Sequence, residues 1–195
     1  MLKVENSDFQ LDVVSVRLVK DHPIYSPVKI KDPESAIKVM GEVMKNLDRE
    51  VLGIINLKTD GTPINCHIVS VGTLNGSLAE PREMLKASIL SNAASMIMIH
   101  NHPSGELFPS GQDISITDRM SKVCGLVGIP LQDHVIVGGK NEGYFSFREK
   151  GVVKFMPLME YATDINQIKL GKVAERGGDG GREVYNRGTD DSKKR

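Results

Sequence analysis

The order of apolar and polar positions along the chain is typical of a mixed α/β protein. Between residues 10 and 20, Val14, Val16 and Leu18 alternate with polar neighbours. This period of two predicts a half-buried strand at the edge of a sheet. Turn residues at 59–63 join two further apolar runs into a predicted hairpin. Strands are thus expected at residues 10–20, 50–58, 64–72, 96–100, 134–138 and 144–147.

Three other segments repeat apolar residues at helical spacing. Asp32 and Pro33 supply an N-cap and a first-turn proline for the first helix, and Pro81 begins the second. The third helix follows the loop at 101–112. Helices placed between strands in this order predict a sheet covered by helices. The predicted apolar faces are Ile37, Met40, Met44 and Leu47, then Leu85, Ile89, Ala93 and Met96, then Ile116, Met120, Val123 and Val127.

The chain changes character near its end. Residues 171–195 contain six glycines, seven Lys or Arg and five Asp or Glu, with few large apolar side chains. Such a segment cannot bury enough apolar surface to order itself. We therefore expect one domain over residues 1–157, which includes the N-terminal strand, and an extension over 158–195 that is disordered from about residue 171.

Composition narrows the classes of function. The 195 residues contain 25 Lys or Arg and 25 Asp or Glu, so a net charge of zero gives no support to nonspecific nucleic-acid binding. Cys66 and Cys124 are far apart, which favours reduced thiols over a disulfide or a CxxC metal site. The charged N-terminus and the lack of an apolar run of about 18 residues argue against export and membrane insertion. A cytoplasmic protein is expected.

The segment from His100 to Asp113 carries the candidate chemistry. His100 and His102 stand two positions apart at the end of a predicted strand, so their imidazoles project to the same side. Asp113, at the start of the third helix, would complete a set of three ligands. Three protein ligands on zinc leave a position for water, which is the arrangement of a catalytic site. Ser110 and Asp113 also match a capping box, and a first-turn residue can serve both purposes.

These residues also carry a family resemblance. HNHPSG at 100–105 with PSGQD at 109–113 resembles the metal-binding signature of the JAB/MPN (JAMM) metalloprotease superfamily. GTLNGSLAEPREMLKASIL, LQDHVIVGG and YFSFRE are similar to its bacterial RadC-like branch, and the similarity covers about residues 30–150. The resemblance implies a cytidine-deaminase-like fold with a mixed central sheet flanked by helices. It also implies zinc held by His100, His102 and Asp113, with Ser110 placed to hydrogen-bond the oxyanion.

The resemblance further implies a general base at the start of the strand that follows the first helix. Glu50 holds that position, and Glu80, Glu83 and Glu106 are the other acidic candidates. We expect His134 to be a buried or supporting residue rather than a fourth ligand. His67 is expected to be structural.

The implied activity is a zinc metallopeptidase or isopeptidase that acts on a peptide or protein. Deamination is disfavoured, because its HxE and PCxxC signatures are missing. The alternative is a noncatalytic module associated with DNA repair, a label that RadC-like proteins carry. The 30 or so residues before the first helix leave no room for the helix-hairpin-helix region of longer members. The sequence leaves the oligomeric state open, although an edge strand at 10–20 could pair between subunits.

Overall fold

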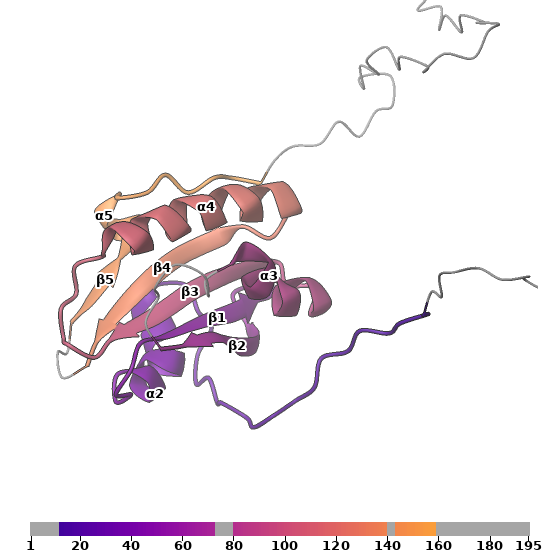
Figure 1. Ribbon diagram of the computed structural model, residues 1–195, viewed down its shortest axis with the longest axis horizontal. Helices are drawn as coiled ribbons and strands as arrows, with labels where there is room; N and C mark the ends of the chain where they lie inside the picture. Colours follow the sequence, from indigo (N-terminus) through magenta and orange to yellow (C-terminus); the bar gives the residue numbers. More distant parts are fainter. Residues whose placement is uncertain (1–11, 73–79, 140–142, 159–195) are drawn as a thin grey trace, which may run out of the picture. The chain divides into compact units, whose positions relative to one another are not determined.

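A mixed sheet of five strands, in the order β2-β1-β3-β4-β5, forms the centre of the domain (Figure 1). The computed structural model describes residues 12–72, 80–139 and 143–158. β1 pairs antiparallel with both β2 and β3, β3 pairs parallel with β4, and β4 pairs antiparallel with β5. The predicted hairpin and mixed sheet are thereby confirmed. The strands are β1 Val51–Leu57, β2 Pro63–Val71, β3 Ser95–His102, β4 Leu131–Gly138 and β5 Tyr144–Ser146.

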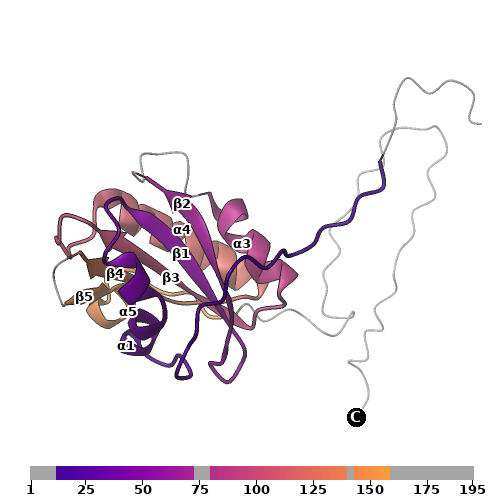
Figure 2. The same cartoon turned by 90° about the horizontal axis from the view of Figure 1, so that it is seen from below.

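Helices cover both faces of this sheet. The first helical segment runs through α1 Pro33–Ala36, η1 Ile37–Gly41 and α2 Glu42–Met44, and η1 is a π-helical turn. Asp32 caps it as predicted, because its carboxylate accepts a hydrogen bond from the Ser35 backbone N–H. α1 and α4 lie on opposite sides of the strands (Figure 2). The remaining helices are α3 Pro81–Leu90, α4 Gly111–Val127 and α5 Phe147–Lys150.

β3 divides the core into two layers by the alternation of its side chains. Ile97 and Ile99 pack towards α1, η1 and α2, whereas Met96 and Met98 pack towards α3 and α4. Both layers are buried, so β3 reads as a continuous apolar run until its last three residues. His100 continues the Met96 and Met98 series and is therefore directed to the side of α3 and α4.

The predicted N-terminal strand is wrong for residues 12–20, which form no strand. Val14 and Val16 are 78% and 70% exposed. The local pattern of a strand was present, but a strand also needs a neighbour for its backbone hydrogen bonds, and the described residues provide none. Residues 1–11 lie outside the described residues, as does the extension from 159 onward with its predicted disorder.

The predicted face of the second helix is also wrong at its end. α3 stops at Leu90, so Ala93 lies in a turn and Met96 in β3, while Ile89 is half-exposed. Val127, on the predicted face of α4, is exposed as well. The apolar residues after α3 matched helical spacing by chance, although they belong to the turn and to β3. Within the described residues, no helix has both the length and the apolar character needed to span a membrane.

Candidate metal centre

The end of β3 and the start of α4 bring three ligand-type side chains together. His100, His102 and Asp113 are all buried. The two His Nε2 atoms are 2.9 Å apart, and Asp113 Oδ1 is 3.4 Å from His100 Nε2. The predicted convergence of the two imidazoles is confirmed, and the group of three could hold a metal ion.

Capping of α4 fixes the orientation of Asp113. Asp113 Oδ2 accepts hydrogen bonds from the Ser110 backbone N–H and the Ser110 hydroxyl, at 2.7 and 2.6 Å. Ser110 Oγ in turn accepts from the Asp113 backbone N–H, at 3.1 Å, so the predicted capping box is confirmed. Both donors bind the same carboxylate oxygen. Capping therefore leaves Oδ1 facing the histidines.

A hydrogen-bonded chain behind His100 determines where its proton lies. The Thr117 hydroxyl donates to the Asp113 backbone carbonyl at 2.5 Å, since a carbonyl oxygen can only accept. Thr117 Oγ1 then accepts from His134 Nδ1–H at 2.6 Å, which leaves His134 Nε2 as an acceptor for His100 Nδ1–H at 2.7 Å. The Nε2 atom of His100 is left without a proton.

A different hydrogen bond leaves the Nε2 atom of His102 as an acceptor. Its Nδ1–H donates to the backbone carbonyl of Glu106 at 2.6 Å, so its Nε2 also carries a lone pair. No donor among the described residues reaches Asp113 Oδ1. Three buried acceptors without protons thus face one point. Buried acceptors are nearly always satisfied in proteins, and a cation is the group that satisfies all three.

The hydrogen bonds from His100 through His134 to Thr117 could also run in the opposite direction, but this would leave other groups unsatisfied. If His100 Nε2 carried a proton for His102, each bond behind it would reverse and Thr117 would donate to His134. Thr117 Oγ1 and the Asp113 carbonyl would then face each other at 2.5 Å as two acceptors. A cation at the His–His–Asp group keeps the chain through His134 and Thr117 intact and takes the place of the contact between the two Nε2 atoms. The residues present therefore fit a metal ion.

Burial favours the neutral forms of His100 and His134. Burial lowers the pKa of His100 to about 4, although the charge of Asp113 acts in the opposite direction. Burial likewise lowers the pKa of His134 well below its usual value, and His100 and His102 lower it further. The prediction that His134 supports the site from within the core is confirmed by its contact with His100. Sequence reasoning missed Thr117, whose only signal was its place one helical turn after Asp113.

Glu50 lies immediately before β1, half-buried, and its backbone carbonyl accepts from the Gly72 N–H at 2.8 Å. Leu52 pairs with His100 in the antiparallel register of β1 and β3, and two further residues along this register bring Glu50 opposite His102. Cross-strand partners share a face of the sheet, so an extension of this register beyond β1 would place Glu50 on the face of the His–His–Asp group. Its function as a base remains a prediction.

Asn101 secures the backbone on both sides of Glu50. Its Oδ1 accepts from the Val51 N–H at 2.8 Å, and its Nδ2 donates to the Arg49 carbonyl at 3.1 Å. Asn101 is fully buried and stands between the two histidines in sequence. Sequence reasoning missed this residue, because nothing in the sequence indicates which distant backbone groups its amide meets.

The other acidic candidates have different partners. The Glu106 carboxylate accepts from the Phe108 N–H, Glu83 pairs with Lys86, and Glu80 pairs with Arg119. His67 is partly buried in β2.

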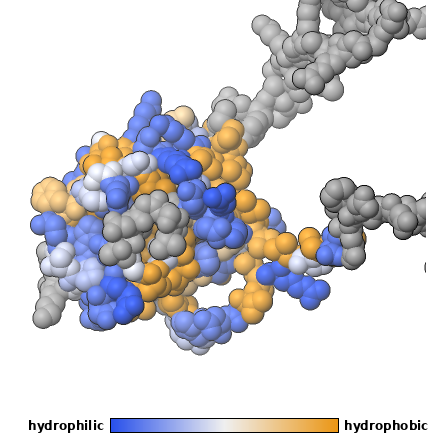
Figure 3. Space-filling view, in the orientation of Figure 1, coloured by the Kyte–Doolittle hydropathy of each residue, from blue (hydrophilic) through white to orange (hydrophobic). Residues whose placement is uncertain are grey.

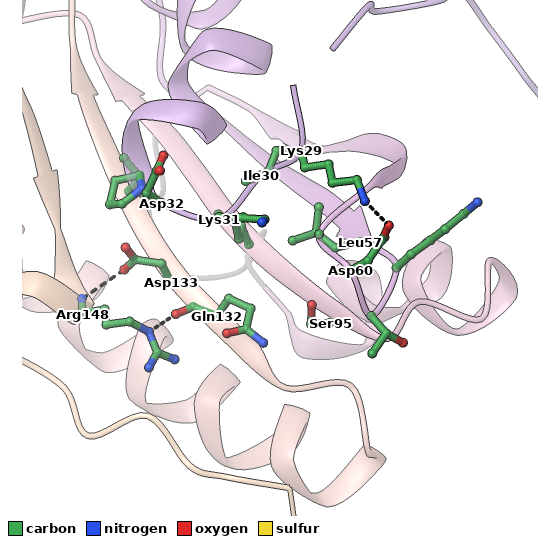
Figure 4. Close-up of a pocket in the computed structure, with 16 residues that line it drawn as sticks. Lys29, Ile30, Lys31, Asp32, Leu57, Asp60, Ser95, Gln132, Asp133 and Arg148 are labelled. Carbon is green, nitrogen blue, oxygen red and sulfur yellow. Dashed lines mark hydrogen bonds and ion pairs between the residues drawn. The ribbon is translucent and has the colours of Figure 1, made fainter. Parts of the chain in front are cut away.

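A cavity of about 610 Å³ lies away from the metal-ligand group, at the first residues of β3 (Figure 4). Ser95 and Ile97 contribute to its wall. Lys29 and Asp60 on its rim pair with each other, and Asp133 accepts hydrogen bonds from Ser146 and from the backbone of Arg148. The acidic groups of this cavity are therefore occupied by the protein itself.

Comparison with known proteins finds relatives for most of this domain. Residues 30–152 match the model of the RadC-like JAB domain. A UPF0758 protein of Desulfitobacterium hafniense is 39% identical over 137 residues, and one of Rubrobacter xylanophilus is 42% identical over 124 residues. These alignments cover 70% and 64% of this chain but 59% and 53% of the relatives, so the chain spans little more than half of their length.

Proposed function

The chain belongs to the family of RadC-like JAB domains, and from this we propose that it is a zinc-dependent metallopeptidase or isopeptidase that hydrolyses an amide bond. The observation that carries the proposal is the meeting of three buried ligand atoms within 4.8 Å of one another, one of which, Asp113 Oδ1, has no hydrogen-bond partner among the described residues. His100, His102 and Asp113 would hold the ion. Two imidazoles and one carboxylate form a ligand set typical of catalytic zinc with an open position.

When bound, zinc supplies an acidified water and a Lewis acid for a carbonyl oxygen. The protein supplies the movement of protons. Glu50, on the same face as His102, takes a proton from the attacking water and delivers it to the leaving amine. The Asn101 hydrogen bonds to Val51 and Arg49 hold the backbone that carries Glu50 in a fixed position.

Ser110 is suited to the oxyanion because it is exposed and its hydroxyl can change partner. This hydroxyl donates to Asp113 Oδ2, which also accepts from the Ser110 backbone N–H. Rotation of the hydroxyl towards a substrate oxygen therefore leaves Asp113 Oδ2 with one donor. The oxyanion gains a hydrogen bond while the cap keeps its backbone contact.

The first test is metal content. The purified protein is expected to contain zinc in a one-to-one ratio, and His102→Ala is expected to lose it. Glu50→Gln should retain zinc, because Glu50 is no ligand in this scheme. Glu83→Gln, in the exposed pair with Lys86, is the matched control. Wild-type protein without stoichiometric zinc, or unchanged zinc in His102→Ala, would reject the site.

The second test is hydrolysis. New N-termini and freed lysine amines are labelled across a proteome after incubation with wild-type protein, Glu50→Gln or Glu83→Gln. Cleavage is expected with the wild type and Glu83→Gln and is expected to be lost with Glu50→Gln. Cleavage by Glu50→Gln would refute the assigned base. Zinc binding without any cleavage would instead favour the noncatalytic interaction module.

A further inference from the structure

Residues 12–20 have the alternating pattern of a strand but form no strand in the structure. Val13, Val14, Val16 and Val19 are between 70% and 103% exposed, and Leu18 is 46% exposed. Hydrophobic surface lies open along this part of the chain (Figure 3). Five exposed valine and leucine side chains within nine residues form a site for pairing with another strand.

The free edge of the sheet is a matching acceptor. β2 ends the strand order, and no strand of the described residues pairs with its outer side. It is nine residues long, as is the segment 12–20. Ile68 and Val71 on β2 are 44% and 57% exposed. The opposite edge strand, β5, has only three residues and offers a much smaller template.

β2 carries no charged side chain, although Pro63 begins it and its pairing with β1 has two irregularities. Edge strands in natural sheets commonly carry lysine or other charges that oppose a further strand. PINCHIVSV contains no Asp, Glu, Lys or Arg. Arg17 and Lys20 of the segment would therefore meet no like charge on this strand. Residues 65–68, where the pairing with β1 is regular, therefore offer an uncharged edge to another strand.

The linker between residues 12–20 and Ile30 limits whether this segment can reach β2 of its own chain or β2 of a second copy. Ile30 is buried and its N–H donates to the Gly61 carbonyl in the turn before β2. The linker of residues 21–29 contains Pro23 and Pro27, which fix their own φ angles and hold the preceding residues extended. In the structure the segment does not lie on the β2 edge of its own chain, because its valines are exposed and no described strand pairs with the outer side of β2. The prolines limit the paths by which it could fold back, which favours exchange between copies.

We propose that residues 12–20 of one chain add to the free edge of β2 of a second copy, and that the reciprocal pairing forms a twofold homodimer. The exchange covers both unpaired features of each chain at once. Two copies suffice, because each contributes one segment and one edge. The proposal does not involve the metal-ligand residues and is independent of the proposed hydrolysis.

Sedimentation velocity on the full chain over a range of concentrations tests this proposal. The wild type is expected to be a dimer. The triple variant Val14→Lys, Val16→Lys, Leu18→Lys and the edge variant Ile68→Lys are expected to be monomers at concentrations where the wild type is dimeric. Ile89→Lys, at a half-exposed apolar position on α3, is the matched control and should remain dimeric. Far-ultraviolet circular dichroism checks that Ile68→Lys is folded, and Val71→Lys replaces it otherwise.

A mixing experiment separates exchange from other kinds of dimer. The triple variant keeps an intact edge, and Ile68→Lys keeps an intact segment, so their mixture is expected to form a heterodimer with one exchanged strand. A monomeric wild type, a triple variant that stays dimeric, or a mixture that stays monomeric would overturn the proposal. Protection of residues 13–19 from hydrogen exchange in a monomer would also overturn it, by showing pairing within one chain.

Discussion

Thr117→Val tests the origin of the proton-free nitrogen on His100. The substitution preserves the shape of the side chain and removes its hydroxyl. In the native protein this hydroxyl donates to the Asp113 carbonyl and accepts from His134. Without it, His134 Nδ1–H has no acceptor, and nothing opposes transfer of the proton to His134 Nε2. His100 must then accept at Nδ1 and carry its proton on Nε2, which is where the metal ion would bind.

The size of the effect follows from the group left unsatisfied. In the metal-free variant the histidines change tautomer, and the loss of the hydroxyl costs little. In the metal-bound variant His100 Nε2 has no proton, so His134 Nδ1–H stays buried without a partner, at a cost of about 1–3 kcal/mol. Zinc affinity should therefore fall about 10- to 100-fold, as is usual when a partner of a ligand histidine is lost.

Competition with a fluorescent zinc chelator at neutral pH measures this change. Thr117→Ser is the matched control, because it keeps the hydroxyl and should bind zinc within a few-fold of the wild type. The reasoning is refuted if Thr117→Val and Thr117→Ser bind zinc equally tightly. Circular dichroism of the metal-free proteins confirms that the comparison is made between folded chains.

Three further predictions concern the same part of the fold. Burial lowers the pKa of His100 to about 4, so below about pH 6.5 the unfolded chain binds a proton that the folded chain does not. The metal-free protein should therefore lose stability to urea as the pH falls from 6.5 towards 4. Equal stability at pH 7 and pH 5 would contradict this prediction. Asp113→Asn should abolish zinc binding. It should also raise the free energy of unfolding of the metal-free protein by about 1 kcal/mol, because an amide N–H can donate to His100 Nε2. A lower melting temperature of the metal-free variant would contradict this prediction. Asn101→Ala removes two hydrogen bonds to the backbone around Glu50 and should cost about 2 kcal/mol in urea unfolding, with zinc affinity nearly unchanged; a large loss of zinc affinity would show that Asn101 positions the histidines instead.

Local signals in the sequence predicted the parts of the molecule that local contacts determine. Asp32 with Pro33, and Ser110 with Asp113, act within three residues of each other, so their capping roles could be recognised from spacing alone. The two histidines lie on one strand, and the geometry of a strand already places them together. The metal-ligand group needed only one further assumption, that the third helix begins beside the end of that strand.

Contacts between distant residues could not be predicted in the same way. Residues 12–20 have the pattern of a strand but lack a partner in the described structure, and no local signal distinguishes the two situations. Thr117 and His134 are 17 positions apart, and their hydrogen bond depends on how α4 lies on β4. Asn101 reaches Arg49 and Val51 across two strands for the same reason.

The alternation along β3 connects the fold to the chemistry. Met96 and Met98 are buried because this face of the strand lies under α3 and α4, and His100 and His102 continue the same face. Sheet geometry therefore carries two imidazoles into a dry layer whether or not a cation is present. Burial lowers the pKa of His100 and the chain through His134 and Thr117 makes its Nε2 atom an acceptor, so the fold places a buried lone pair beside the Asp113 carboxylate. A bound cation would then contribute to the stability of the end of β3, and the same group of residues would link folding of this region to metal binding.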